Sequence, residues 1–208
     1  YVPELLAAGI RVIDLSGAFR LPQELFEKWY KMQHTAPELL GQAVYGLPAY
    51  FAEQIAKTQL VANPGCYPTA VTLALKPLEG LVQGIARISA TSGNSGDRKP
   101  AEPVSNEETY SYGTKHKHVP EMSLHVGLPV RFTPVVLRSV FRGINANIEV
   151  ELNDKLKQWP EEEAAEMLRC EIKDKYQAED LVLVVEDSSE KVWGTRDVQK
   201  THKAIIKI

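Results

Sequence analysis

Several features that would assign this chain to a special class of protein are missing. Its 208 residues contain only two cysteines, Cys66 and Cys170, too few for a disulfide framework, so we expect a reducing, cytoplasmic location. No segment approaches the ~18 apolar residues of a membrane-spanning helix, and no charged-then-apolar leader opens the chain, so no membrane association is expected. Lys and Arg number 24 and Asp and Glu 27, a formal charge of −3, which gives no reason to expect nucleic acid as a partner.

A glycine-rich dinucleotide-binding turn is missing too, because no Gly-x-Gly occurs in the chain. What is present is an ordinary globular composition, with 44% hydrophobic and 25% charged residues. The length allows one large domain or two small ones.

Hydrophobic patterns predict two architectures in succession. Up to about residue 62, helical and strand patterns alternate, as in an α/β domain. The remainder predicts a mixed sheet with one or two helices, an α+β arrangement. Helices are expected near 4–9, 22–32, 49–57, 69–78 and 160–169, and strands near 10–15, 60–63, 85–91, 130–133, 144–151, 181–186 and 204–208. Residues 92–119 are expected to form a long loop.

The two ends indicate a fragment of a longer protein. The chain opens on a short helix without an initiator Met and closes on a strand with nothing after it. A helix followed by a strand is how a chain begins when it is cut inside an α/β unit. The alternative is a complete small domain with a trimmed terminus.

Cys66 is the strongest candidate for chemistry. It lies in Asn63-Pro-Gly-Cys-Tyr-Pro68, between a predicted strand and a predicted helix. Pro68 suits a first helical turn, so Cys66 would meet the positive end of the helix, where a thiolate is favoured. The alternative is an inert buried cysteine, which is how we interpret Cys170.

A thiolate nucleophile needs a group that manages protons, and the segment Lys115-His-Lys-His-Val-Pro-Glu121 offers imidazoles at His116 and His118 and the Glu121 carboxylate. His-x-His with an acid is also compatible with zinc, but a third and a fourth ligand are not evident, so no metal is expected. A solvated basic loop is the remaining alternative.

Two other turns follow predicted strands. Ser92-Gly-Asn-Ser-Gly96 has small residues that would expose backbone N–H groups as an anion or cofactor cradle, although many ordinary turns look alike. Arg20 follows the first strand, where its guanidinium would clamp a carboxylate or phosphate or make a surface ion pair.

These segments together resemble a known family. Asp14-Leu-Ser-Gly-Ala-Phe-Arg-Leu21, Tyr45-Gly-Leu-Pro48, the Cys66 and His116 segments, Ser92–Gly96 and Phe132-Thr-Pro134 occur in the order found in N-acetyl-gamma-glutamyl-phosphate reductases of arginine biosynthesis. Those enzymes are related to aspartate-semialdehyde dehydrogenase and, more distantly, to glyceraldehyde-3-phosphate dehydrogenase. The resemblance is strong over residues 1 to about 151 and looser beyond.

The resemblance implies the organisation of the chain. Residues 1–62 would be the C-terminal part of an incomplete NADP-binding Rossmann domain, without its phosphate-binding loop. Residues 63–208 would be a mixed-sheet catalytic and dimerisation domain like that of glyceraldehyde-3-phosphate dehydrogenase. The partners implied are a small-molecule acyl phosphate and further copies of the chain, in a homodimer or homotetramer formed through a sheet face.

The resemblance also implies roles for individual residues. Cys66 would attack an acyl phosphate to give a thioester, which NADPH would reduce to the aldehyde, with His116 as general acid/base. Arg20 and Glu121 would lie in the substrate site. The residues near the nicotinamide would be Ser92, Gly93, Ser95 and Gly96. The isolated fragment would be weakly active or inactive.

Three positions depart from the family pattern: Gly96-Asp-Arg-Lys99 is one residue shorter than usual, Val135 replaces a histidine, and Arg196 replaces an asparagine. The first bears on the cofactor and the other two on the substrate. A sister reductase with a carrier-bound substrate and a non-catalytic dimerisation module therefore remain alternatives.

Overall fold

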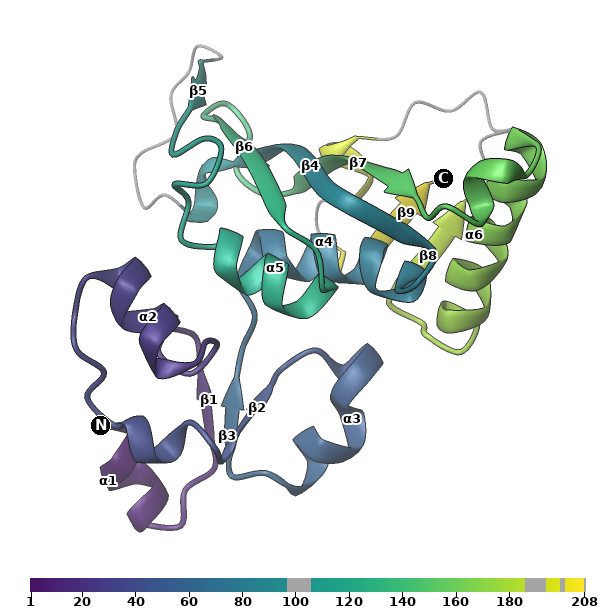
Figure 1. Ribbon diagram of the computed structural model, residues 1–208. Helices are drawn as coiled ribbons and strands as arrows, with labels where there is room; N and C mark the ends of the chain where they lie inside the picture. Colours follow the sequence, from purple (N-terminus) through teal and green to yellow (C-terminus); the bar gives the residue numbers. More distant parts are fainter. Residues whose placement is uncertain (97–105, 186–193, 199–200, 208) are drawn as a thin grey trace. The chain divides into compact units, whose positions relative to one another are not determined.

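The computed structural model describes residues 1–208 except 97–105, 186–193, 199–200 and 208. The chain divides into two compact units, Tyr1–Thr69 and Ala70–Ile208. The predicted fold class is confirmed, since the first unit has α/β character and the second contains a mixed sheet covered by helices (Figure 1).

The first unit is built on a three-stranded parallel sheet in the order β1-β3-β2. Strand β3 (Leu60–Ala62) is buried along its whole length, as a central parallel strand should be. The edge strands are β1 (Val12–Asp14) and β2 (Ala43–Tyr45), and the helices are α1 (Val2–Ala7), α2 (Gln23–Tyr30) and α3 (Pro48–Lys57). One sheet face, with Val12 and Leu60, packs on Phe19 and Ala36 and on the apolar side of α1.

The second unit is built on a four-stranded mixed sheet in the order β5-β6-β4-β7. Its long central strand β4 (Val82–Gly93) runs parallel to β6 (Val130–Leu137) and antiparallel to β7 (Ile144–Leu152). Short strand β5 (Glu107–Thr109) pairs with the free edge of β6. Alternate residues of β4 are buried, so one face of the sheet is apolar and the other is polar.

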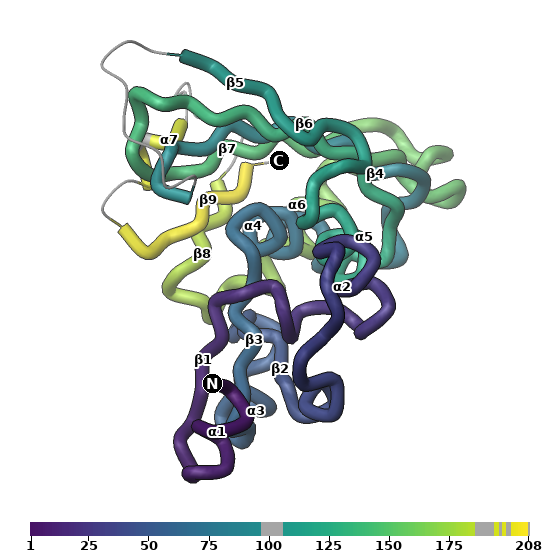
Figure 2. Tube along the Cα trace, turned by 90° about the vertical axis from the view of Figure 1, so that its left-hand side faces the viewer, coloured from purple at the N-terminus to yellow at the C-terminus, as the bar shows by residue number. Residues whose placement is uncertain are grey.

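Helices cover the apolar face of this sheet. Helix α4 (Cys66–Leu75) and helix α5 (Val119–Val126) lie on the same side of it in both views (Figures 1 and 2). Helix α4 is apolar around its circumference, which is typical of a helix buried on all sides. The longer helix α6 (Glu161–Tyr176) carries Tyr176, whose hydroxyl donates to the Leu73 carbonyl of α4 at 2.6 Å.

The C-terminal residues form a small parallel pair of strands, β8 (Val182–Val185) and β9 (Ala204–Lys207), with the short helix α7 (Thr195–Val198) between them. Short 3₁₀ turns occupy Pro37–Leu39, Lys76–Leu78, Asn94–Gly96 and Leu156–Gln158. Among the described residues, no helix is both long enough and apolar enough to cross a bilayer.

Several predicted boundaries are wrong. Strand β5 lies inside the predicted loop 92–119, β2 and α5 were not expected, and α6 continues seven residues beyond the predicted end at 169. Helix α4 begins at Cys66 instead of residue 69, because Pro68 is accommodated within the first turn.

Candidate active site

Cys66 is the first residue of helix α4, and its side chain is exposed. The breaker residues Asn63, Pro64 and Gly65 end the preceding strand and turn the chain into the helix. The Gly65 carbonyl accepts hydrogen bonds from the N–H and the hydroxyl of Thr69, both at 2.9 Å, which closes the first turn. The thiol therefore lies where helix N–H groups and the helix dipole favour a negative charge.

Arg20 holds the turn that leads into Cys66. Its Nε donates to the Asn63 carbonyl at 2.6 Å and its Nη2 to the Leu15 carbonyl at 2.8 Å. The guanidinium thus ties together the segments that follow β1 and β3. Within the first unit, the structure brings Arg20 to the backbone of the cysteine turn, so its described contacts support the position of that turn.

His116 is buried in an aromatic cluster of the second unit. Its ring lies 4.7 to 5.5 Å, between centroids, from the rings of Tyr110, His118 and Phe132. Burial, together with the charge of Lys117, lowers the pKa of His116 from 6.5 to about 4. The imidazole is therefore neutral at neutral pH.

Glu121 lies in the first turn of α5, five residues after His116, and is 1% exposed. At the start of helix α5 the Val119 N–H donates to the His116 carbonyl at 2.9 Å, so the helix follows the histidine segment directly. A carboxylate in a first turn is favoured by the helix dipole. The structure thus brings Glu121 and His116 to one end of one short helix.

The segment 92–96 departs from what its composition suggests. The backbone N–H groups of Gly93, Asn94 and Ser95 donate to the carbonyls of residues 143, 140 and 141, each at 2.9 Å. The expected cradle of exposed N–H groups at 93–95 is therefore wrong. Gly93 is needed for packing, because a Cβ there would lie 2.7 Å from backbone atoms of residues 141 and 142.

Several residues of segment 92–96 are nevertheless exposed to solvent. Ser95 and Gly96 are exposed and Ser92 is half-buried. Asn94 is 3% exposed, and its Oδ1 has no hydrogen-bond partner in the described part of the chain. Of the departures from the family pattern, residues 97–99 and the side chain of Arg196 lie outside the described structure, and Val135 is half-buried in β6.

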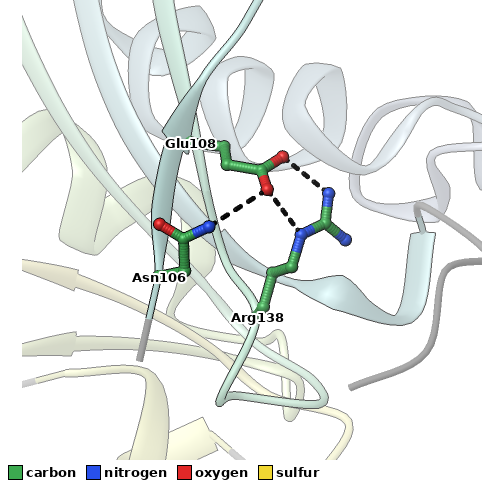
Figure 3. Close-up of polar contacts among 3 residues, drawn as sticks. All are labelled: Asn106, Glu108 and Arg138. Carbon is green, nitrogen blue, oxygen red and sulfur yellow. Dashed lines mark hydrogen bonds and ion pairs between the residues drawn. The ribbon is translucent and has the colours of Figure 1, made fainter. Parts of the chain in front are cut away.

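Sequence reasoning missed Arg138, which is 2% exposed just beyond the end of β6. Its Nε and Nη2 donate to the two Glu108 carboxylate oxygens at 2.8 and 2.6 Å, and Asn106 Nδ2 donates to the same carboxylate at 3.3 Å (Figure 3). The strand alternation contains the signal, because it places residues 130, 132, 134, 136 and 138 on the buried face. A guanidinium on the buried face requires an anionic partner, which here is the half-buried Glu108.

The ion pair between Arg138 and Glu108 holds β5 against the end of β6. Directly after it come the carbonyls at 140–143 that accept hydrogen bonds from Gly93, Asn94 and Ser95.

No group of three or more metal-ligating His, Cys, Asp or Glu side chains occurs within the residues described. Cys66 and Arg20 belong to the first unit, and His116, Glu121 and segment 92–96 to the second.

Comparison with known proteins identifies the family. The family model described as semialdehyde dehydrogenase, dimerisation domain, matches residues 66–208. The chain belongs to this family. It is 48% identical over 133 residues to the N-acetyl-gamma-glutamyl-phosphate reductase of Thermus thermophilus, covering 60% of this chain and 38% of that protein. The reductase of Tolumonas auensis is 50% identical over 161 residues, covering 73% and 48%.

The chain thus spans about half the length, or less, of these curated relatives. Among solved structures, aspartate semialdehyde dehydrogenase II of Vibrio cholerae matches with a TM-score of 0.64 at 19% identity, covering 99% of this chain and 64% of that one. A probable aspartate-semialdehyde dehydrogenase of Pseudomonas aeruginosa gives 0.60 at 14%, covering 100% and 64%. Both matches show that the semialdehyde dehydrogenase fold extends over the whole chain.

Proposed function

We propose that the protein to which this chain belongs reduces N-acetyl-gamma-glutamyl phosphate, with NADPH, to N-acetylglutamate semialdehyde and phosphate, a step of arginine biosynthesis. The names of relatives that are 44–50% identical support this reaction. The structural observation that carries it is the exposed thiol of Cys66 at the first residue of α4.

Cys66 supplies the nucleophile in this proposal. Its thiolate attacks the acyl-phosphate carbonyl, the bond from that carbon to the phosphate oxygen breaks, and a thioester remains on Cys66. Backbone N–H groups at the start of α4 are suited to stabilise the negative oxygen of the tetrahedral intermediate. We assign His116 as the general acid/base that supplies or removes the proton at the same oxygen. Arg20 holds the cysteine turn, and Glu121 binds the substrate.

The chemistry of segment 92–96 supports a nicotinamide cofactor. The Asn94 Oδ1 is an acceptor without a described partner, which suits the carboxamide N–H₂ of a nicotinamide, and Ser95 and Gly96 are exposed beside it. We propose that these residues, with Ser92 and Gly93, hold the nicotinamide end of NADPH. When bound, the cofactor supplies the hydride that reduces the thioester. The glycine-rich pyrophosphate turn is not among these 208 residues.

The polar face of the four-stranded sheet is the surface we assign to self-association. Residues Arg87, Ser89, Arg131 and Thr133 on β4 and β6 are exposed there, side by side in register. The matched family model is named for a dimerisation domain. We therefore propose a homodimer, or a homotetramer built from it, that packs through this face.

Thiol reactivity tests the assignment of the nucleophile. Iodoacetamide should alkylate Cys66 much faster than Cys170 at pH 7, as measured by mass spectrometry of peptides. Cys170 is the matched control: it is exposed, so its interpretation as a buried cysteine was wrong. Desolvation, a hydrogen bond to Glu166 and the charge of that carboxylate raise the pKa of its thiol. Equal alkylation rates would contradict the proposal.

Activity of the full-length protein tests the reaction. Cys66→Ser should abolish NADPH-dependent reduction of N-acetyl-gamma-glutamyl phosphate, whereas Cys170→Ser should leave it unchanged. Activity that survives Cys66→Ser would refute the role of Cys66. Preference for a carrier-bound acyl phosphate would identify a sister reductase, and a parent protein that binds no NADPH would indicate a dimerisation module.

A further inference from the structure

Segment 92–96 is held by the turn at residues 138–143, which directly follows strand β6. The N–H groups of residues 93–95 donate to three backbone carbonyls of this turn, each at 2.9 Å. The two backbones also pack closely, because a Cβ on Gly93 would lie 2.7 Å from backbone atoms of the turn. The position of the turn therefore sets the position of Asn94.

Arg138 begins this turn, and both its backbone and its side chain bind the β5 region. Its N–H donates to the Asn106 carbonyl at 3.2 Å. Its Nε and Nη2 donate to the two carboxylate oxygens of Glu108 at 2.8 and 2.6 Å (Figure 3). An arginine that binds a carboxylate through two parallel hydrogen bonds fixes direction as well as distance. The ion pair thus determines where the turn starts.

The backbone ladder between β5 and β6 is weak beside this pair. Strand β5 has only three residues. The Tyr110 N–H donates to the Pro134 carbonyl at 3.3 Å. In an antiparallel ladder a residue donates and accepts on the same side, but the proline has no N–H to return. Ser111 then leaves the strand with a φ of 44°. The side-chain pair therefore supplies a constraint that the ladder alone does not.

We propose that Arg138 and Glu108 are positioning residues for the cofactor: their ion pair fixes the turn at 138–143, and the turn holds Asn94 where its Oδ1 accepts from the nicotinamide carboxamide. This inference rests on the proposed NADPH-dependent reduction, in which segment 92–96 holds the nicotinamide. Asn94 is 3% exposed, and its Oδ1 finds no partner among the residues that the structure describes. All of these groups belong to the second unit.

The carboxamide is the part of the cofactor that should be sensitive to this arrangement. In reduced 3-acetylpyridine adenine dinucleotide phosphate a methyl group replaces the carboxamide amino group, so this analogue has no N–H to donate to Asn94. A displaced Asn94 should therefore weaken the binding of NADPH and not that of the analogue. A general loss of folded protein would instead lower activity with both cofactors equally.

Hydrogen exchange tests the link before any cofactor is added. In the full-length protein, Glu108→Gln and Arg138→Lys should each make peptides that contain residues 92–96 exchange about tenfold faster than in the wild type, as measured by mass spectrometry. Gln keeps the size of Glu and Lys keeps the charge of Arg, but neither restores the two-point ion pair. Two variants are used so that the test survives if one of them does not fold.

Two controls separate a local effect from a general one. Arg169→Lys changes the exposed pair in which Arg169 Nε lies 2.7 Å from Glu166, and it should leave exchange at 92–96 unchanged. Residues 148–152 of β7 should exchange at the wild-type rate in every variant. Unchanged exchange at 92–96, or equal acceleration at 92–96 and 148–152, would overturn the proposal.

Cofactor binding tests the consequence. Both variants should raise the Kd for NADPH, measured by calorimetry, and its KM by about fivefold, the size of one lost hydrogen bond. Both constants for the acetylpyridine analogue and the KM for the acyl phosphate should stay unchanged. Asn94→Ala should discriminate between the cofactors in the same way, and adding Glu108→Gln to it should have no further effect.

The remaining outcomes distinguish this inference from the proposed function. An equal increase of Kd for NADPH and for the analogue would overturn the positioning role, while the Cys66 chemistry would stand. If the wild-type protein binds no NADPH, or if Cys66→Ser leaves aldehyde formation unchanged, the proposed function fails, even where the exchange experiment shows that the ion pair holds segment 92–96.

Discussion

Removing one oxygen atom from Tyr176 should weaken the second unit measurably. The Tyr176 hydroxyl donates to the Leu73 carbonyl at 2.6 Å, and the residue is 3% exposed. In an α-helix the Leu73 carbonyl would accept from the amide four residues later. That residue is Pro77, which has no N–H, so the tyrosine takes the place of the missing helix donor.

The expected cost follows from this substitution of one donor for another. A net hydrogen bond contributes about 1 kcal/mol, and a buried carbonyl left without a donor costs about 1–3 kcal/mol. Tyr176→Phe should therefore lower the free energy of unfolding by about 2 kcal/mol. With a urea dependence of about 1–3 kcal/mol per molar, the midpoint falls by roughly 1 M. The matched control is Tyr112→Phe, which removes the same atom from a side chain that is 60% exposed and should change the midpoint little.

A double-mutant cycle separates this explanation from a general loss of packing. Pro77→Ala restores an amide that can donate to Leu73, so Tyr176→Phe should cost less in that background than in the wild type. Urea unfolding followed by circular dichroism measures all four proteins. An equal cost of Tyr176→Phe in both backgrounds, or a cost no greater than that of Tyr112→Phe, would refute the reasoning.

Three further outcomes are expected. Gly93→Ala should lower thermal stability sharply, since its Cβ would meet backbone at 2.7 Å, whereas Gly96→Ala, with nothing described within 4 Å, should not. Thr72→Val should raise the free energy of unfolding by about 1 kcal/mol, measured by urea unfolding, because its buried hydroxyl has no hydrogen-bond partner among the described residues. The pKa values of His116 and His125 are lowered to about 4, so the unfolded state binds more protons than the folded state between pH 6.5 and 4. Acidification from pH 7.5 to 5.5 should therefore lower the free energy of unfolding, measured in urea, by about 1 kcal/mol per histidine. An unchanged free energy of unfolding would contradict those shifts.

Local sequence was sufficient to locate the thiol. The residues Asn63, Pro64 and Gly65 disfavour continuation of the strand, and Pro68 is favoured in the first turn of a helix. Together they predict that Cys66 lies at the start of a helix, as the structure has it. The same holds for the central strand β4, because its alternation extends over many residues. The predicted segment 85–91 underestimated that strand only at its ends.

Contacts between segments far apart in the chain could not be predicted from the sequence. Strand β5 has three residues and exists because β6 offers it an edge and Arg138 pairs with Glu108. The N–H groups of segment 92–96 looked available because their acceptors lie about 50 residues away, after β6. Composition identifies a small-residue turn but not the partner of each amide.

The environments of the two proposed reactive groups indicate how the thiolate forms. Moving a proton from a thiol of ordinary pKa, about 8.5, to an imidazole whose pKa is about 4 costs about 6 kcal/mol. His116 is therefore a poor base for Cys66, and the helix start must favour the thiolate by itself. The pH dependence of Cys66 alkylation by iodoacetamide should then be the same in the wild-type protein and in His116→Gln. If the midpoint of that profile rises in the variant, the imidazole does ionise the thiol, and the independence argued here is wrong.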